Sequence, residues 1–176
     1  MIREIVKMGN PLLRRVSRDV SEEFVKSDEF AQLLLDMRDS MKHYGGIGIA
    51  APQIGVELKV AIIELGENNR YGEDIRFPFQ VFINPEIEYL TDSLSAHWEG
   101  CLSVPGLRGY VERPEKVKVT YRDENFTKKE IIAEGFLATV LQHELDHLFG
   151  ILYVDRIKDI TKLIFQKEYE VFIQGE

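Results

Sequence analysis

The residues best suited to chemistry form a His-Glu-x-x-His pattern, His143-Glu144-Leu145-Asp146-His147. Because four residues make just over one helical turn, both imidazoles leave the same face of a helix and can bind one metal ion. Glu144 lies beside them and can accept a proton from water. Asp146 points elsewhere on such a helix and is expected to be a surface acid or an acid that supports a ligand. Two exposed surface histidines are the alternative, which the helical setting disfavours.

Two histidines alone hold a catalytic metal incompletely, since such sites use three protein ligands and leave one position for water. Gly150 fits one known extension of the motif, but the next ligand position in that extension holds Tyr153, a poor ligand. The remaining candidates are Glu168 or Glu170 in a charged stretch near the end of the chain, and His43, His97 and Cys101 before the motif. Cys101 is preferred because it is the only soft anionic ligand in the sequence.

Cys101 lies in the stretch Trp98–Gly106, where flanking glycines and a proline allow the backbone to approach a substrate closely. A lone cysteine is more often a small buried side chain, so this setting decides in favour of a ligand. One sulfur and two nitrogens leave a fourth tetrahedral position for water, whose pKa such a cation lowers toward roughly 7. With Glu144 taking the remaining proton, the predicted reaction is hydrolysis of a carbonyl compound.

Two helices and several strands are expected to position these residues. Apolar residues recur with helical spacing from Ser27 to Tyr44 and from Gly135 to Phe149, and the second of these helices carries the metal motif. A last helix is expected over 159–173. The β-like runs are 58–63, 81–84, 116–121 and 128–133, of which the last two predict an antiparallel hairpin. The pattern predicts an α+β fold, with small antiparallel sheets around the motif helix and with N-terminal and C-terminal helices.

Composition excludes several classes of protein. The 176 residues, 44% hydrophobic and 30% charged, are typical of a single globular domain over 1–176. No run approaches the roughly 18 apolar residues of a membrane span and no signal peptide is evident, so a cytoplasmic location without membrane contact is expected. The net charge of −8 disfavours binding to DNA or RNA. A single cysteine cannot form an internal disulfide.

Three blocks of the sequence together resemble the peptide deformylase family. They are Gly46-Ile47-Gly48-Ile49-Ala50-Ala51-Pro52-Gln53, Glu99-Gly100-Cys101-Leu102-Ser103 and Gln142-His143-Glu144-Leu145-Asp146-His147. The resemblance implies an enzyme that removes the formyl group from the N-terminal formylmethionine of newly made proteins and releases formate. It also implies Fe(2+) as the natural metal, with Zn(2+), Ni(2+) or Co(2+) able to replace it. The donor set alone does not choose among these ions.

The resemblance also implies a role for each matched residue. Cys101, His143 and His147 would bind the metal, and Glu144 would serve first as base and then as acid toward the leaving amine. The side-chain amide of Gln53 and the backbone N–H of Leu102 would stabilise the oxyanion, an arrangement typically worth about 3–4 kcal/mol per donor.

Some substrate contacts can be predicted from the helical spacing of residues before His143. Phe136, Thr139 and Val140 should share the helix face of His143 and line a pocket for methionine, unless they belong to the core. Ile47 and Gly48 offer a main-chain edge to an extended peptide, and Gly100 allows close approach beside the ligand. Glu99 is expected to support the metal site through hydrogen bonds, paired with Arg108 or Arg113.

Two segments depart from the family pattern. Residues 67–79 form a longer connection than compact members need and are interpreted as a surface loop. From Asp155 onward the chain has four basic and five acidic residues, whereas family members that dock at the ribosome have a basic C-terminal helix. Any transient ribosome contact would therefore be weakened. The aromatic residues Phe165, Tyr169 and Phe172 are expected to pack on the body of the protein.

Two other functions fit parts of the pattern. A metallopeptidase would use Glu168 or Glu170 as third ligand, would keep activity after Cys101→Ser and would cut unformylated peptides. A non-catalytic metal-binding module would fill all four positions with protein ligands and would not need Glu144.

Overall fold

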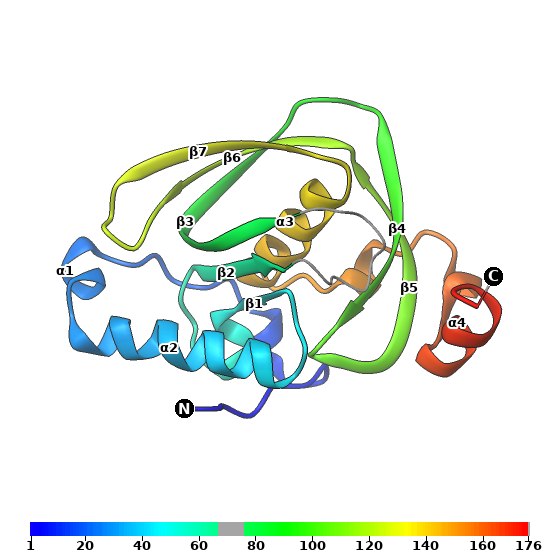
Figure 1. Cartoon of the computed structure of the whole chain (residues 1–176), viewed down its shortest axis with the longest axis horizontal. Coiled ribbons are helices and arrows are strands. Elements are labelled where there is room, and N and C mark those ends of the chain that lie inside the picture. Colours follow the sequence, from blue (N-terminus) through cyan, green and yellow to red (C-terminus); the bar gives the residue numbers. More distant parts are fainter. Residues whose placement is uncertain (67–75, 176) are drawn as a thin grey trace.

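The computed structural model describes residues 1–66 and 76–175 and has the predicted α+β fold. Two antiparallel sheets lie on either side of a central helix (Figure 1). The five-stranded sheet has the order β1-β2-β3-β6-β7, and the three-stranded sheet has the order β4-β5-β8. The strands are β1 Gly48–Ala50, β2 Val60–Leu65, β3 Phe77–Tyr89, β4 Leu94–Cys101, β5 Val104–Pro114, β6 Lys116–Arg122, β7 Lys128–Glu134 and β8 Leu163–Phe165.

The central helix is α3, Gly135–Leu148, which carries the His-Glu-x-x-His motif as predicted. It contacts strands of both sheets, and twelve of its fourteen residues are buried. Because apolar and polar residues alike are enclosed, the polar ones need partners inside the protein. The helix is followed by Gly150 at φ +75°, where an added Cβ would lie 2.6 Å from the carbonyl carbon of Arg14. Only glycine fits that left-handed, closely packed position.

The N-terminal helix α2, Asp28–His43, also agrees with the prediction. Ser27 caps it by accepting a hydrogen bond from the backbone of Phe30. Its apolar face packs against β1, β2 and β3 in one hydrophobic core, and a second core lies between the five-stranded sheet and α3. Shorter helical pieces precede and follow these elements: η1 Pro11–Arg14, α1 Glu22–Val25, η2 Ala51–Ile54, η3 Tyr153–Arg156 and η4 Ile160–Lys162.

The β6–β7 hairpin confirms the prediction made from alternation, with Lys116 opposite Glu134 and Arg122 opposite Lys128. The β4–β5 hairpin was not predicted. Its strands run through Trp98–Gly106, and only Leu102 and Ser103 lie between them. Glycine and proline usually mark loops, but here they fall within paired strands and around the turn.

The C-terminal segment corrects the prediction of one helix over 159–173. Leu163–Phe165 forms strand β8, paired with Leu107–Gly109 on the open edge of β5, and only Gln166–Phe172 forms helix α4. Strand pairing with β5 overrides the local helical spacing. Phe165 and Phe172 are 68% and 64% exposed, so the expected packing holds only for Tyr169, whose ring lies 5.5 Å from that of Trp98.

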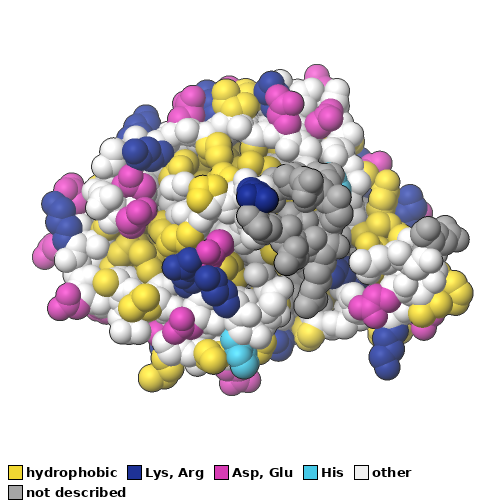
Figure 2. Space-filling model, in the orientation of Figure 1, with side chains coloured by type: hydrophobic (Ala, Val, Ile, Leu, Met, Phe, Trp, Pro, Cys, Tyr) yellow, Lys and Arg dark blue, Asp and Glu magenta, His cyan; other side chains and the backbone are white. Residues whose placement is uncertain are grey.

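The expected surface loop at 67–79 lies largely outside the described residues, and 77–79 begin β3. In the part of the chain that the structure describes, no helix has the length and apolar character needed to cross a membrane. Figure 2 shows basic and acidic side chains interspersed over one face of the molecule.

Candidate metal centre

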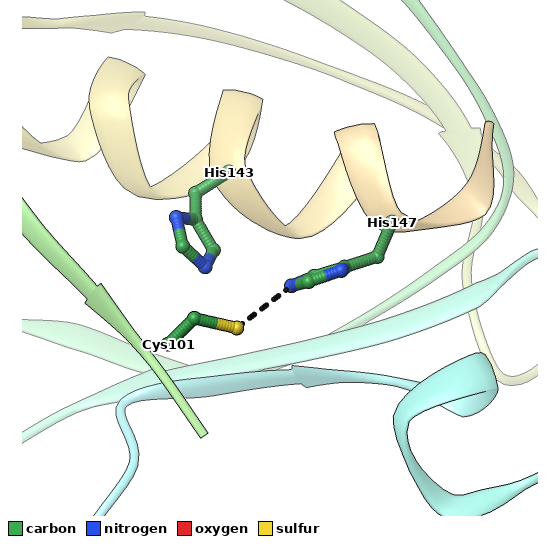
Figure 3. A group of neighbouring side chains, drawn as sticks. All are labelled: Cys101, His143 and His147. Atoms are coloured by element: carbon green, nitrogen blue, oxygen red, sulfur yellow. Dashed lines mark hydrogen bonds between the residues drawn. The ribbon is translucent and has the colours of Figure 1, made fainter. Parts of the chain in front are cut away.

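Cys101, His143 and His147 come together between β4 and α3, with one potential ligand atom of each lying within 4.8 Å of the others. Both histidines leave the same face of α3, and Cys101 reaches them from the end of β4 (Figure 3). The sulfur lies 3.3 Å from Nε2 of His147. One thiol and two imidazole nitrogens converging on one point suit a divalent transition metal with an open coordination position. The donor set therefore fits the three-ligand metal site that the sequence predicts.

The orientation of His143 is fixed by Glu99. Its Nδ1 lies 2.7 Å from Oε2 of Glu99, which leaves Nε2 to face the sulfur. Arg113 donates to both oxygens of the same carboxylate, at 2.6 and 3.0 Å. Burial raises the pKa of Glu99, but the hydrogen bonds from His143 and Arg113 outweigh it and lower the pKa to about 2. Of the two arginines considered for Glu99, the structure pairs it with Arg113.

The same arginine extends the network to Asp146. Arg113 Nη1 donates to Asp146 Oδ2 at 2.8 Å, and Arg156 donates to both oxygens of Asp146 at 2.7 and 3.1 Å. Asp146 is buried, so it is the acid that supports the site and not an acid of the helix surface. Two carboxylates and two guanidiniums thus link α3 to β4, β5 and η3. They contact the metal ligands through the bond between Glu99 and His143.

Glu144 lies in the wall of the cleft beside the ligands. It is 5% exposed, and its Oε2 has no hydrogen-bond partner among the described residues. A Cβ built on Gly48 would lie 2.7 Å from the Glu144 carboxyl, so glycine there lets the β1 backbone approach this side chain. Burial raises the pKa of Glu144 to about 7. An acid of this pKa can either hold or accept a proton near neutral pH.

Gln53 presents its amide nitrogen to the site. Its Oε1 accepts a hydrogen bond from the backbone of Ala50 at 2.8 Å, which turns Nε2 toward Cys101 Sγ at 3.4 Å and Ser103 Oγ at 3.3 Å. Ser103 is fully buried, and its backbone N–H also donates to the Cys101 sulfur at 3.4 Å. Sequence reasoning gave Ser103 no role, although it belongs to a recognised block.

The N-terminal segment joins the turns that hold these groups. The N–H of Val6 donates to the carbonyl of Gln53, and that of Met8 donates to the carbonyl of Ser103, each at 2.8 Å. Lys7 Nζ donates to the carbonyl of Leu102 at 3.1 Å. Sequence reasoning missed this segment because most of these bonds are made by backbone, which leaves no trace in residue type.

A cleft of about 670 Å³ opens over the ligands. All six residues expected at the substrate line it: Ile47, Gly48, Gly100, Phe136, Thr139 and Val140. Gln53, Glu99, Cys101, Leu102, Arg108, His143 and Glu144 also line it, while His147 lies 1% exposed behind them. Trp98 and Gln166 are further wall residues that the sequence did not indicate.

The other candidates for the third ligand lie away from the two histidines. His97 contacts Thr139 Oγ1 at 3.1 Å, and His43 lies exposed at the end of α2. Glu168 and Glu170 are exposed on α4. Tyr153 stacks on His143 with ring centres 6.0 Å apart, which supports the imidazole from behind.

Comparison with known proteins identifies the family of this chain. The model of the polypeptide deformylase family matches residues 2–163. The chain belongs to the peptide deformylase family. It is 50% identical to a peptide deformylase of Leptospira biflexa over 95% of this chain and 93% of that protein. It is 47% identical to peptide deformylase 2 of Ralstonia nicotianae over 94% and 92% of the two chains.

A solved structure extends the likeness to the fold. The class I type b peptide deformylase of Acinetobacter baumannii with Met-Ala-Ser bound has a TM-score of 0.86 and 38% identity, over 89% of this chain and 99% of that one. Peptide deformylases are metal-dependent hydrolases that remove the N-formyl group from nascent peptides, and this chain shares that activity with its family.

Proposed function

We propose that residues 1–176 form one catalytic domain that hydrolyses the formyl amide of N-formylmethionyl peptides at the Cys101, His143 and His147 centre. The observation that carries this proposal is the convergence of these three donors beside Glu144 and Gln53, next to a cleft that Cys101 and His143 line. The ion is proposed to be Fe(2+), with Zn(2+), Ni(2+) or Co(2+) able to replace it. When bound, such an ion lowers the pKa of water and polarises a carbonyl oxygen.

Glu144 is the general base and then the general acid. Its carboxylate accepts a proton from the attacking water and returns it to the amide nitrogen as that nitrogen leaves. Its burial in the cleft wall and its packing against the β1 backbone at Gly48 keep it next to the substrate. An amide nitrogen leaves poorly unless protonated, so one side chain serves both steps.

Two donors stabilise the oxyanion that forms as water attacks the formyl carbon. The first is Nε2 of Gln53, which the hydrogen bond between Oε1 and the backbone of Ala50 turns toward Cys101. The second is the backbone N–H of Leu102 in the tight β4–β5 turn. Because both are held before substrate arrives, little reorganisation is needed during the reaction.

The remaining wall residues bind the peptide. Phe136, Thr139 and Val140 receive the methionine side chain, and the backbone at Ile47, Gly48 and Gly100 contacts the peptide chain. Glu99 and Arg113 do not touch substrate and hold His143 in its orientation. The bound Met-Ala-Ser of the Acinetobacter baumannii relative supports a peptide in this cleft.

We propose a cytoplasmic location, because formylated nascent chains are made in that compartment. A transient contact with the ribosome through α4 is expected to be weak, because this helix has one lysine and two glutamates and lacks a basic face for RNA phosphates. Co-sedimentation with ribosomes at low salt tests this, and tight binding lost on removal of α4 contradicts it.

Formate release from formyl-Met-Ala-Ser, measured together with metal content, tests the central proposal. The Cys101→Ser variant should lose both metal and activity, while Glu144→Gln should keep the metal and lose activity. An active Cys101→Ser variant would favour the metallopeptidase alternative, as would cleavage of unformylated Met-Ala-Ser. The exposure of Glu168 and Glu170 on α4 argues against that alternative.

A further inference from the structure

The C-terminal segment, residues 163–172, lies beside the cleft although it comes late in the sequence. Strand β8 pairs with Leu107–Gly109 of β5, which places Ile164 of β8 opposite Arg108. Helix α4 then packs next to the β4–β5 sheet, at the right of Figure 1. Gln166, its first residue, lines the cleft together with Arg108 and Trp98. The segment therefore forms part of the cleft wall.

Gln166, Tyr169 and Gly100 all lie next to the Arg108 guanidinium. Its Nε donates to Oε1 of Gln166 at 2.5 Å. Its Cζ lies 5.5 Å from the ring centre of Tyr169, within the range of a cation–π contact. A Cβ added to Gly100 would lie 2.8 Å from its Nη1, so the group rests against the backbone next to Cys101. Arg108 is thus held between α4 and the floor of the cleft.

The two residues of α4 that contact Arg108 are themselves anchored. The Tyr169 ring packs against Trp98, which in turn packs against Tyr110 at 5.4 Å between ring centres. The amide nitrogen of Gln166 donates to Glu170 Oε1 at 2.6 Å, which leaves its oxygen for Arg108. These contacts tie α4 to the sheet and set the direction of the Gln166 acceptor.

We propose that Gln166 and Tyr169 are positioning residues, which hold Arg108 so that it binds backbone carbonyls of the substrate residues after the formylmethionine. The inference rests on the proposed function, because the formyl group must lie at the metal centre. A group that rests on the Gly100 backbone then lies beside the peptide as it leaves that centre. A guanidinium presents several N–H donors in one plane, which suits the carbonyl oxygens of an extended chain.

The proposal predicts an effect that depends on substrate length. With the metal-loaded enzyme, Gln166→Ala should raise KM for formyl-Met-Ala-Ser about tenfold, equivalent to ~1.4 kcal/mol, and leave kcat within about twofold. The KM for formylmethionine amide, which has no residues after the methionine, should not change. Phe172→Ala is the matched control, since this side chain lies on the same helix and is 64% exposed. It should leave both KM values unchanged.

A double mutant separates positioning from general stabilisation. If Gln166 acts through Arg108, Gln166→Ala adds nothing to the KM of an Arg108→Ala enzyme. Gln166→Glu keeps an acceptor oxygen and should restore the KM of the wild type, even if Gln166→Ala loosens the segment. Additive effects of the two substitutions, or an equal rise in KM for both substrates, overturn the proposal. Failure of the wild type to release formate would instead overturn the proposed function.

Discussion

The inner end and the mouth of the cleft are built in different ways. At the inner end, Glu99, Arg113 and Asp146 form ion pairs whose side chains are 3–11% exposed. The mouth is the more exposed part of the cleft wall, which includes Glu64 and Gln166. There Glu64 pairs with Arg38, and the two side chains are 24% and 40% exposed. Buried charges are costly to leave without a partner, whereas partly solvated pairs exchange readily with water. The inner end therefore keeps its geometry through buried ion pairs, whereas the Arg38–Glu64 pair is open to water.

The largest effect is expected where the inner end touches the reaction. Glu144→Gln should lower kcat for formate release about 10³- to 10⁴-fold, because the amide can neither accept the proton of water nor deliver it to the leaving amine. Metal content should stay at the wild-type level. Glu168→Gln is the control, since this glutamate is exposed on α4, and its activity should be unchanged. If the Glu144→Gln enzyme stays active, another residue must be the general base.

Removing Arg113 from its ion pairs with Glu99 and Asp146 should show how much these buried pairs contribute to the free energy of unfolding. Arg113→Met leaves two buried carboxylates without this partner and should lower the free energy of unfolding by about 3–5 kcal/mol, measured by urea denaturation. Lys118→Met removes a partly exposed pair between Lys118 on β6 and Glu88 on β3, and it should lower the free energy of unfolding far less than Arg113→Met does. Similar losses for the two variants would contradict the distinction between buried and solvated pairs.

The oxyanion donor gives a smaller effect than the base. Gln53→Ala should lower kcat about 10²- to 10³-fold with little change in KM, because the amide acts on charge that develops during the reaction. Ser103→Ala removes one contact of the same amide but leaves its bond to Ala50. Its kcat should fall by less than about tenfold. If both substitutions act mainly on KM, Gln53 binds the ground state instead of the oxyanion.

The sequence predicts the inner end better than the mouth, for physical reasons. The spacing of His143 and His147 and the alternation of β6 and β7 are local signals that need no knowledge of distant contacts. Pairing of β8 with β5 depends on an open strand edge that local periodicity does not reveal. For this reason 159–173 resembled one helix, and Gln166 was not recognised as a wall residue. The partners of Asp146 were likewise hidden, because Arg113 and Arg156 lie in other elements.

The smallest expected effect is the pH dependence of the stability that the Arg38–Glu64 pair contributes. Hydrogen bonds from Arg38 and then Lys42 lower the pKa of Glu64 despite its partial burial. The contribution of this pair to stability is therefore present above pH 4.5 and is lost as pH falls below that value, through the lowered pKa. Glu64→Gln should cost about 0.5–1 kcal/mol at pH 7 and less at pH 3, measured by urea unfolding. A cost that stays constant with pH would mean that packing of the side chain, and not its charge, supports the mouth.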